Sequence, residues 1–81
     1  MALEQREFNL NGNRVVATEL TLGQFKKVQK VSAEHGDIEG TSLMVALATG
    51  VTVEQLDELP ASAISDFTEI VSWLSDFLSK S

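Results

Sequence analysis

The sequence predicts an α+β fold in one domain, residues 1–81, with an N-terminal β-hairpin followed by three to four α-helices packed on it. Two observations predict this class. Apolar and polar residues alternate on both sides of an Asn-Gly pair between residues 5 and 20, which is typical of a hairpin. Between residues 21 and 80, apolar residues recur at helical spacing between glycine and proline breaks. Because an isolated hairpin is only marginally stable in water, we expect the helices to cover it.

In the predicted hairpin, Asn11-Gly12 is the dipeptide that a two-residue primed turn prefers, because both turn positions require a positive φ. The strand residues that carry the alternating pattern are Phe8, Leu10, Val15, Ala17 and Thr18.

The first predicted helix begins at Thr21, since Thr21 and Gln24 have the spacing of a capping box. It ends near His35-Gly36, where a glycine can adopt the left-handed cap. One half of its helical wheel, which we expect to face the core, contains Leu22, Phe25, Val28, Gln29, Val31 and Ser32. The other half contains Lys26, Lys27 and Lys30.

The second predicted helix starts with Asp37 or Thr41 as its cap and stops at Gly50. From residue 43 to residue 48 it is apolar on every side, which is typical of a buried helix, so we expect it to lie centrally.

A second capping box, Thr52 with Gln55, predicts a short helix through Leu59 that Pro60 ends. The last helix opens at Ala61 or Ser62 and runs to about residue 78. Its apolar face covers about half of the wheel, which is wider than one packing contact needs. The residues of that face are Ile64, Phe67, Ile70, Val71, Trp73, Leu74, Phe77 and Leu78.

The charge is unevenly distributed. The chain has a net charge of −6, and residues 31–81 contain nine of its twelve acids with Lys80 as their only base. An acidic body repels phosphate backbones, so we expect no nucleic-acid partner. No stretch approaches the roughly 18 apolar residues of a membrane span, and the N-terminus lacks the apolar segment of a signal peptide. We therefore expect no membrane partner and a location in the cytoplasm.

Catalytic and metal-binding patterns are weak. Without cysteine there is no thiol nucleophile or thiolate zinc site, and the one histidine, His35, lies at a predicted helix end where a solvated residue is usual. The acid pairs Asp37/Glu39 and Asp57/Glu58 lack the partners of a calcium loop or a glycosidase cleft. No glycine-rich nucleotide loop is present. The sequence therefore predicts a non-enzymatic protein without a metal or cofactor.

One enzyme-linked alternative is an acyl-carrier-like protein modified with phosphopantetheine at Ser42. Carriers attach this group to a serine at a helix start within an Asp-Ser-Leu motif. Here Ser42-Leu43-Met44 has a similar apolar context, but Thr41 replaces the aspartate. The predicted hairpin also does not suit an all-helical carrier, so this alternative ranks last.

The C-terminal half contains short motifs in a distinctive order. They are the helix stop Ala48-Thr49-Gly50, the turn from Thr52 to Leu59, the helix opening Asp66-Phe67 and the end Phe77-Leu78. The segment from Glu19 to Leu22 has the character of a strand-to-helix junction. Together these features, over about two thirds of the chain, resemble the small tail assembly chaperones of contractile-tailed bacteriophages and related prophages.

This resemblance implies a non-enzymatic role, in which the protein binds the aggregation-prone tape measure protein while the tail is built. A chaperone of this kind needs an exposed apolar groove, and we expect client contacts at Ile70, Trp73 and Phe77. Trp73 alternatively packs over the hairpin and completes the core. The last helix alternatively forms a homo-oligomer, in which case the chain is a small interaction or dimerisation module.

The lysine stripe formed by Lys26, Lys27 and Lys30 has two interpretations. It is either a solvated helix face or a contact with an acidic client segment or the acidic body of another copy.

Overall fold

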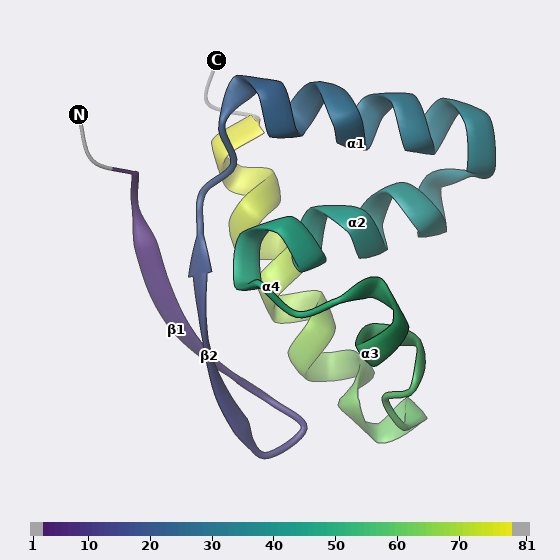
Figure 1. Cartoon of the computed structure of the whole chain (residues 1–81). Helices are drawn as coiled ribbons and strands as arrows, with labels where there is room; N and C mark the ends of the chain where they lie inside the picture. The colour runs from purple at the N-terminus through teal and green to yellow at the C-terminus, as the bar shows by residue number, and fades with distance from the viewer. Residues whose placement is uncertain (1–2, 79–81) are drawn as a thin grey trace.

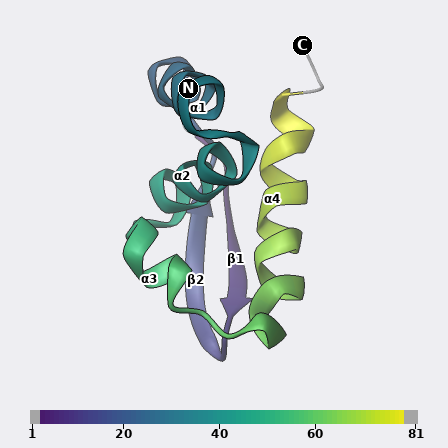
Figure 2. The ribbon, with the colours of Figure 1, turned by 90° about the vertical axis from the view of Figure 1, so that its right-hand side faces the viewer.

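The computed structural model describes residues 3–78 and confirms the predicted class, a hairpin followed by helices (Figure 1). The helix α4 crosses behind the other helices and beside the hairpin, so the core lies between α2, α4 and the sheet (Figures 1 and 2). The elements in chain order are β1 (Gln5–Leu10), β2 (Asn13–Thr18), α1 (Leu22–His35), α2 (Asp37–Thr49), α3 (Val53–Asp57), a 3-10 turn (Ala61–Ala63) and α4 (Ile64–Leu78).

The hairpin has the predicted turn. Asn11 and Gly12 have φ angles of 53° and 83°, as a primed two-residue turn requires, and they place Leu10 opposite Asn13. The turn is also attached to α4, because the backbone N–H of Asn11 donates to Oδ2 of Asp66 at 3.2 Å. The hairpin residues that are buried against the helices are Phe8, Leu10 and Ala17.

The corner between α1 and α2 differs from the prediction. Gly36 has φ 99° and ψ 162°, which is outside the left-handed helical region, and it terminates α1 and precedes α2 directly. Neither Asp37 nor Thr41 caps α2, because the helix already begins at Asp37. The carboxylate of Asp37 instead accepts a hydrogen bond from the Ser32 hydroxyl at 2.7 Å, which fastens the two helices at this corner.

The capping box at Thr21 is present, but α1 buries a narrower face than predicted. Only Val28 is fully buried, Gln29 is exposed, and 69% of Leu22 is exposed. The reason is the position of α1 at one edge of the molecule, where it packs mainly on α2 (Figure 1). A single helix contact needs only a narrow apolar stripe, so part of the apolar half of the wheel remains at the surface.

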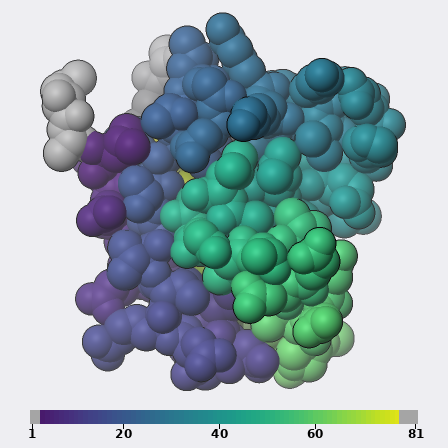
Figure 3. Space-filling view, in the orientation of Figure 1, coloured from purple at the N-terminus to yellow at the C-terminus, as the bar shows by residue number. Residues whose placement is uncertain are grey.

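The central position predicted for α2 is confirmed, since α2 contacts α1, β2, α3 and α4. The space-filling view shows α2 and α3 in the centre of this face, beside the hairpin (Figure 3). The two largest fully buried side chains, Val45 of α2 and Ile70 of α4, belong to this packing. The buried core consists of Phe8, Leu10, Ala17, Val28, Met44, Val45, Ala48, Leu56, Ile70 and Leu74.

The capping box at Thr52 is also present, although α3 ends at Asp57, two residues earlier than predicted. The chain tightens there, because the N–H of Leu59 bonds to the carbonyl of Leu56 only three residues before it. Pro60 then takes an extended conformation and precedes the 3-10 turn that leads into α4. This turn brings α3 and the start of α4 together beside α2, and so creates a surface depression described below.

Candidate functional site

The predicted partner surface on α4 divides between core and surface. Ile70 has 0% of its surface exposed, so the prediction that it contacts a client is wrong. The hairpin and α2 both pack on α4, and their combined contact covers the side of the helix that carries Ile70. Trp73 and Phe77 are half-buried and retain exposed area.

Trp73 lies in a row of three aromatic rings. Its ring meets Phe8 of β1 edge-on with centroids 5.7 Å apart, and it meets Phe77 edge-on at 4.9 Å. Both contacts have the edge-to-face geometry that aromatic pairs prefer. Trp73 thus packs on the hairpin, as the core alternative expects, and its exposed part borders a shallow polar depression with Arg6 and Glu69.

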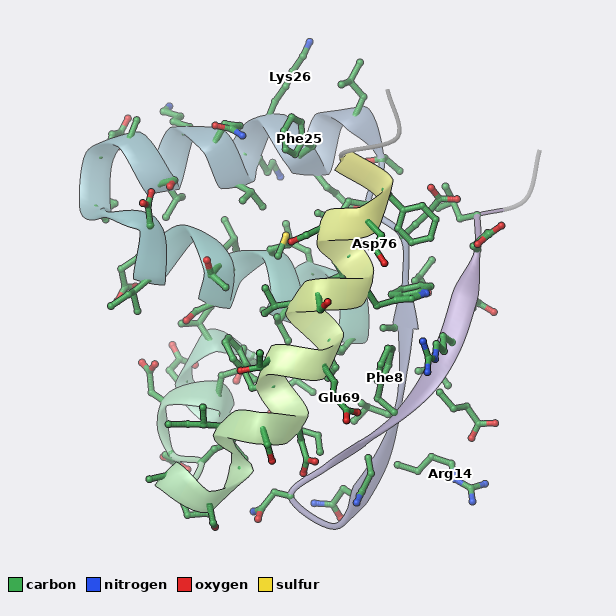
Figure 4. All side chains as sticks on the ribbon, turned by 180° about the vertical axis from the view of Figure 1, so that it is seen from behind. Phe8, Arg14, Phe25, Lys26, Glu69 and Asp76 are labelled. Atoms are coloured by element: carbon green, nitrogen blue, oxygen red, sulfur yellow. The ribbon has the colours of Figure 1, made fainter. Side chains whose placement is uncertain are left out.

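Arg6 extends this row at the surface. Its guanidinium carbon lies 5.0 Å from the centroid of the Phe8 ring, a cation–π distance. Phe8 and Glu69 lie close together on the side of α4 that faces the hairpin (Figure 4). Charged side chains therefore surround Phe8 and Trp73 at the surface. The surface beside Phe77, on the side of α1, is lined mostly by apolar residues.

Phe77 borders a groove between the start of α1 and the end of α4, which we call the α1–α4 groove. Its volume is about 230 Å³. Phe25 lies toward the C-terminal end of α4, and the neighbouring Lys26 points away from the molecule (Figure 4). Leu22, at the first position of α1, is mostly exposed at this groove. The groove is lined by Glu19, Leu20, Thr21, Leu22, Phe25, Leu74 and Phe77.

The sequence did not reveal the contribution of Leu22 and Phe25 to this groove. Their helical spacing predicted core positions, and only the packing of α1 on a single helix leaves them at the surface. The only feature of the sequence that relates to this groove is Leu22, a large apolar residue in the first turn of α1.

The lysine stripe lies on the exposed side of α1. Lys26, Lys27 and Lys30 are all exposed, and within residues 3–78 none of them forms an ion pair. The acids lie elsewhere: residues 36–78 contain eight Asp and Glu residues and no Lys or Arg. The molecule therefore has a basic outer edge on α1, whereas the charged side chains of α2, α3 and α4 within residues 37–78 are all acidic.

A larger apolar depression, which we call the α3–α4 pocket, lies where α2, α3 and the start of α4 meet. Its volume is about 320 Å³. Helical periodicity did not predict this pocket, because the turn at Pro60 brings its walls together from separate segments. It is lined by Ser42, Leu56, Leu59, Pro60, Ala61, Ala63, Ile64 and Phe67.

The position of Ser42 does not match a carrier serine. Since α2 begins at Asp37, Ser42 lies in the second turn of the helix and is half-buried against the α3–α4 pocket. A serine at the helix start, which the carrier alternative requires, is not what the structure shows.

The remaining candidate groups are dispersed. His35 lies at the exposed end of α1, with Nε2 3.9 Å from a carboxylate oxygen of Glu34. Among the described residues, no three His, Asp or Glu side chains lie close enough together to hold a metal ion. None of the helices within residues 3–78 is long and apolar enough to cross a membrane.

Comparison of the chain with protein-family models, with curated proteins and with solved structures returns no match.

Proposed function

We propose that this protein is a non-enzymatic tail assembly chaperone of a bacteriophage or prophage, which binds a helical segment of the tape measure protein in the bacterial cytoplasm. The observation that carries the binding role is the α1–α4 groove, an apolar surface with an exposed leucine and two aromatic residues. The tail role rests on the resemblance of the motifs between Ala48 and Leu78 to that family.

The groove has properties that suit a protein segment. Its volume of about 230 Å³ is below the roughly 300–1,000 Å³ of small-molecule sites, so it fits individual apolar side chains. Phe25 and Phe77 are rigid aromatic anchors, and Leu22 extends the apolar area beyond them. An amphipathic client helix would place apolar side chains from successive turns on this surface, which is the helix-in-groove mode.

Lys26 adds a charge at the edge of this surface. It follows Phe25 directly on α1 and has no ion-pair partner within the described residues. A client helix with acids flanking its apolar stripe would therefore gain attraction to the lysine stripe, and that attraction would weaken as salt is added.

The same groove would serve the second candidate, a soluble interaction or dimerisation module without a tail role. Homodimerisation through the wide apolar face of α4 has less support, because Ile70 and Leu74 of that face are buried within the monomer.

Gene neighbourhood separates the two candidate functions. The chaperone proposal expects a tape measure gene immediately downstream, and a neighbourhood without virion genes would contradict it.

Replacing Leu22 with serine is expected to reduce the amount of tape measure protein that co-purifies with the chain by about tenfold. Leu22 is exposed, so the variant should fold normally while losing roughly the contact of one apolar side chain with the client. Val16→Ser is the matched control, because Val16 is also exposed but lies on the hairpin. If the Leu22 variant and the wild type co-purify equal amounts of tape measure protein, the client does not bind at the α1–α4 groove.

A further inference from the structure

Two of the most exposed apolar side chains lie beside the α3–α4 pocket. Ile64 lines the pocket and is 61% exposed, and Ile38 is 81% exposed. Ile38 precedes Ser42, another lining residue, by one helical turn on α2, so the two residues lie on the same face of that helix. We call the pocket with these two exposed isoleucines the Ile38–Ile64 surface.

The lining of the α3–α4 pocket is mostly apolar. The pocket is formed mainly by carbon atoms of Leu, Ile, Ala, Pro and Phe side chains, with the Ser42 hydroxyl as its polar side-chain group. Contiguous apolar area with polar residues around it marks interaction sites on monomeric proteins. The pocket is separate from the α1–α4 groove, because the two share no lining residue.

The charges around this surface all have one sign. Glu39 follows Ile38 on α2, while Asp57 and Glu58 lie in the chain between the lining residues Leu56 and Leu59, and all three acids are exposed. From residue 36 to residue 78 the sequence has no Lys or Arg to compensate them. A partner at this surface therefore meets apolar side chains in the centre and carboxylates around them.

We infer that the Ile38–Ile64 surface binds a cationic amphipathic helix of another protein. The apolar side chains of the partner helix at i, i+3 or i+4, and i+7 would enter the pocket and contact Ile38 and Ile64. Its Lys and Arg side chains would lie near Glu39, Asp57 and Glu58, which attract a cationic segment and repel an anionic one. This site is separate from the proposed client site, because the pocket and the α1–α4 groove share no lining residue.

The test uses the whole protein and a synthetic 18-residue amphipathic helix built from leucine and lysine. Two control peptides keep its length: one replaces each lysine with glutamate, and the other replaces each leucine with serine. Binding is followed by the backbone amide resonances of the isotope-labelled protein. We expect the Leu/Lys peptide to shift the amides of Ser42, Leu59 and Ile64 in a saturable manner, and both control peptides to leave them unchanged.

Variants then locate the site. Ile64→Ser is expected to weaken the Leu/Lys peptide about tenfold, because the exposed side chain contributes apolar contact without supporting the fold. The double variant Asp57→Asn with Glu58→Gln should make binding less sensitive to salt. Leu22→Ser, at the other groove, should leave the affinity unchanged. Equal binding of the Leu/Glu peptide, or an affinity that Ile64→Ser does not alter, would overturn the inference.

The outcomes also separate this inference from the proposed function. Failure of the Leu/Lys peptide to shift Ser42, Leu59 and Ile64 would overturn the cationic-helix site and leave the Leu22-dependent client site intact. If the protein binds the Leu/Lys peptide but does not bind the tape measure protein, the proposed function is overturned and the cationic-helix site stands.

Discussion

Replacing Ile70 with alanine is expected to lower the free energy of unfolding by about 2–5 kcal/mol. Ile70 has no exposed surface and lies among the buried side chains shared by the hairpin, α2 and α4. Truncating such a residue loses its transfer free energy and leaves a cavity. A domain of this size has only about 4–12 kcal/mol of stability, so the variant should lose a large part of it.

Urea unfolding followed by circular dichroism measures this loss. The control is Ile64→Ala in the same helix, where the side chain is exposed and the expected change is within about 0.5 kcal/mol. Similar unfolding midpoints for the two variants would show that Ile70 is not a core residue, and would return it to the candidate client surface.

Replacing Gly40 with alanine is expected to destabilise the protein by about 1–3 kcal/mol, although alanine favours helices. A β-carbon at position 40 would lie 2.7 Å from Cβ and 3.0 Å from Cα of Ser32, closer than such atoms approach. Because Ser32 Cα belongs to the backbone of α1, the two helices would have to separate to make room. For a domain of this size the melting temperature should fall by about 5–20 °C.

Gly23→Ala is the matched control for that change. Gly23 lies in α1 with only the Thr21 hydroxyl near its missing β-carbon, at 3.9 Å, so alanine fits there. It should leave the melting temperature unchanged or raise it, because alanine loses less backbone entropy than glycine in a helix. If thermal scans show Gly40→Ala to be as stable as Gly23→Ala, then α1 and α2 do not approach as closely as described.

Local chemistry made most of the fold predictable from the sequence. The primed turn at Asn11-Gly12 and the capping boxes at Thr21 and Thr52 depend on neighbouring residues alone, and all three occur in the structure. The corner at Gly36 was predicted incorrectly in detail, because Gly36 takes φ 99° and ψ 162°, a conformation open essentially to glycine alone, instead of the left-handed helical cap.

The candidate site was less predictable, for a physical reason. Helical spacing shows which residues share a face, but not how much of that face the neighbouring elements cover. Ile70 was expected at the surface but is buried, because both the hairpin and α2 pack on α4. Leu22 was expected in the core but is exposed, because α1 packs mainly on α2 alone. The α3–α4 pocket depends on the path of the chain through Pro60, which periodicity does not describe.

The proposed function requires this protein to keep an aggregation-prone tape measure protein in solution. The most direct measurement is the soluble fraction of the tape measure protein from the same genome, expressed in bacteria alone, with the wild-type chain and with Leu22→Ser. The proposal predicts that the wild-type chain markedly increases the soluble fraction and that the Leu22 variant does so much less. An unchanged soluble fraction with the folded wild-type chain present at equal or higher concentration would contradict the claim.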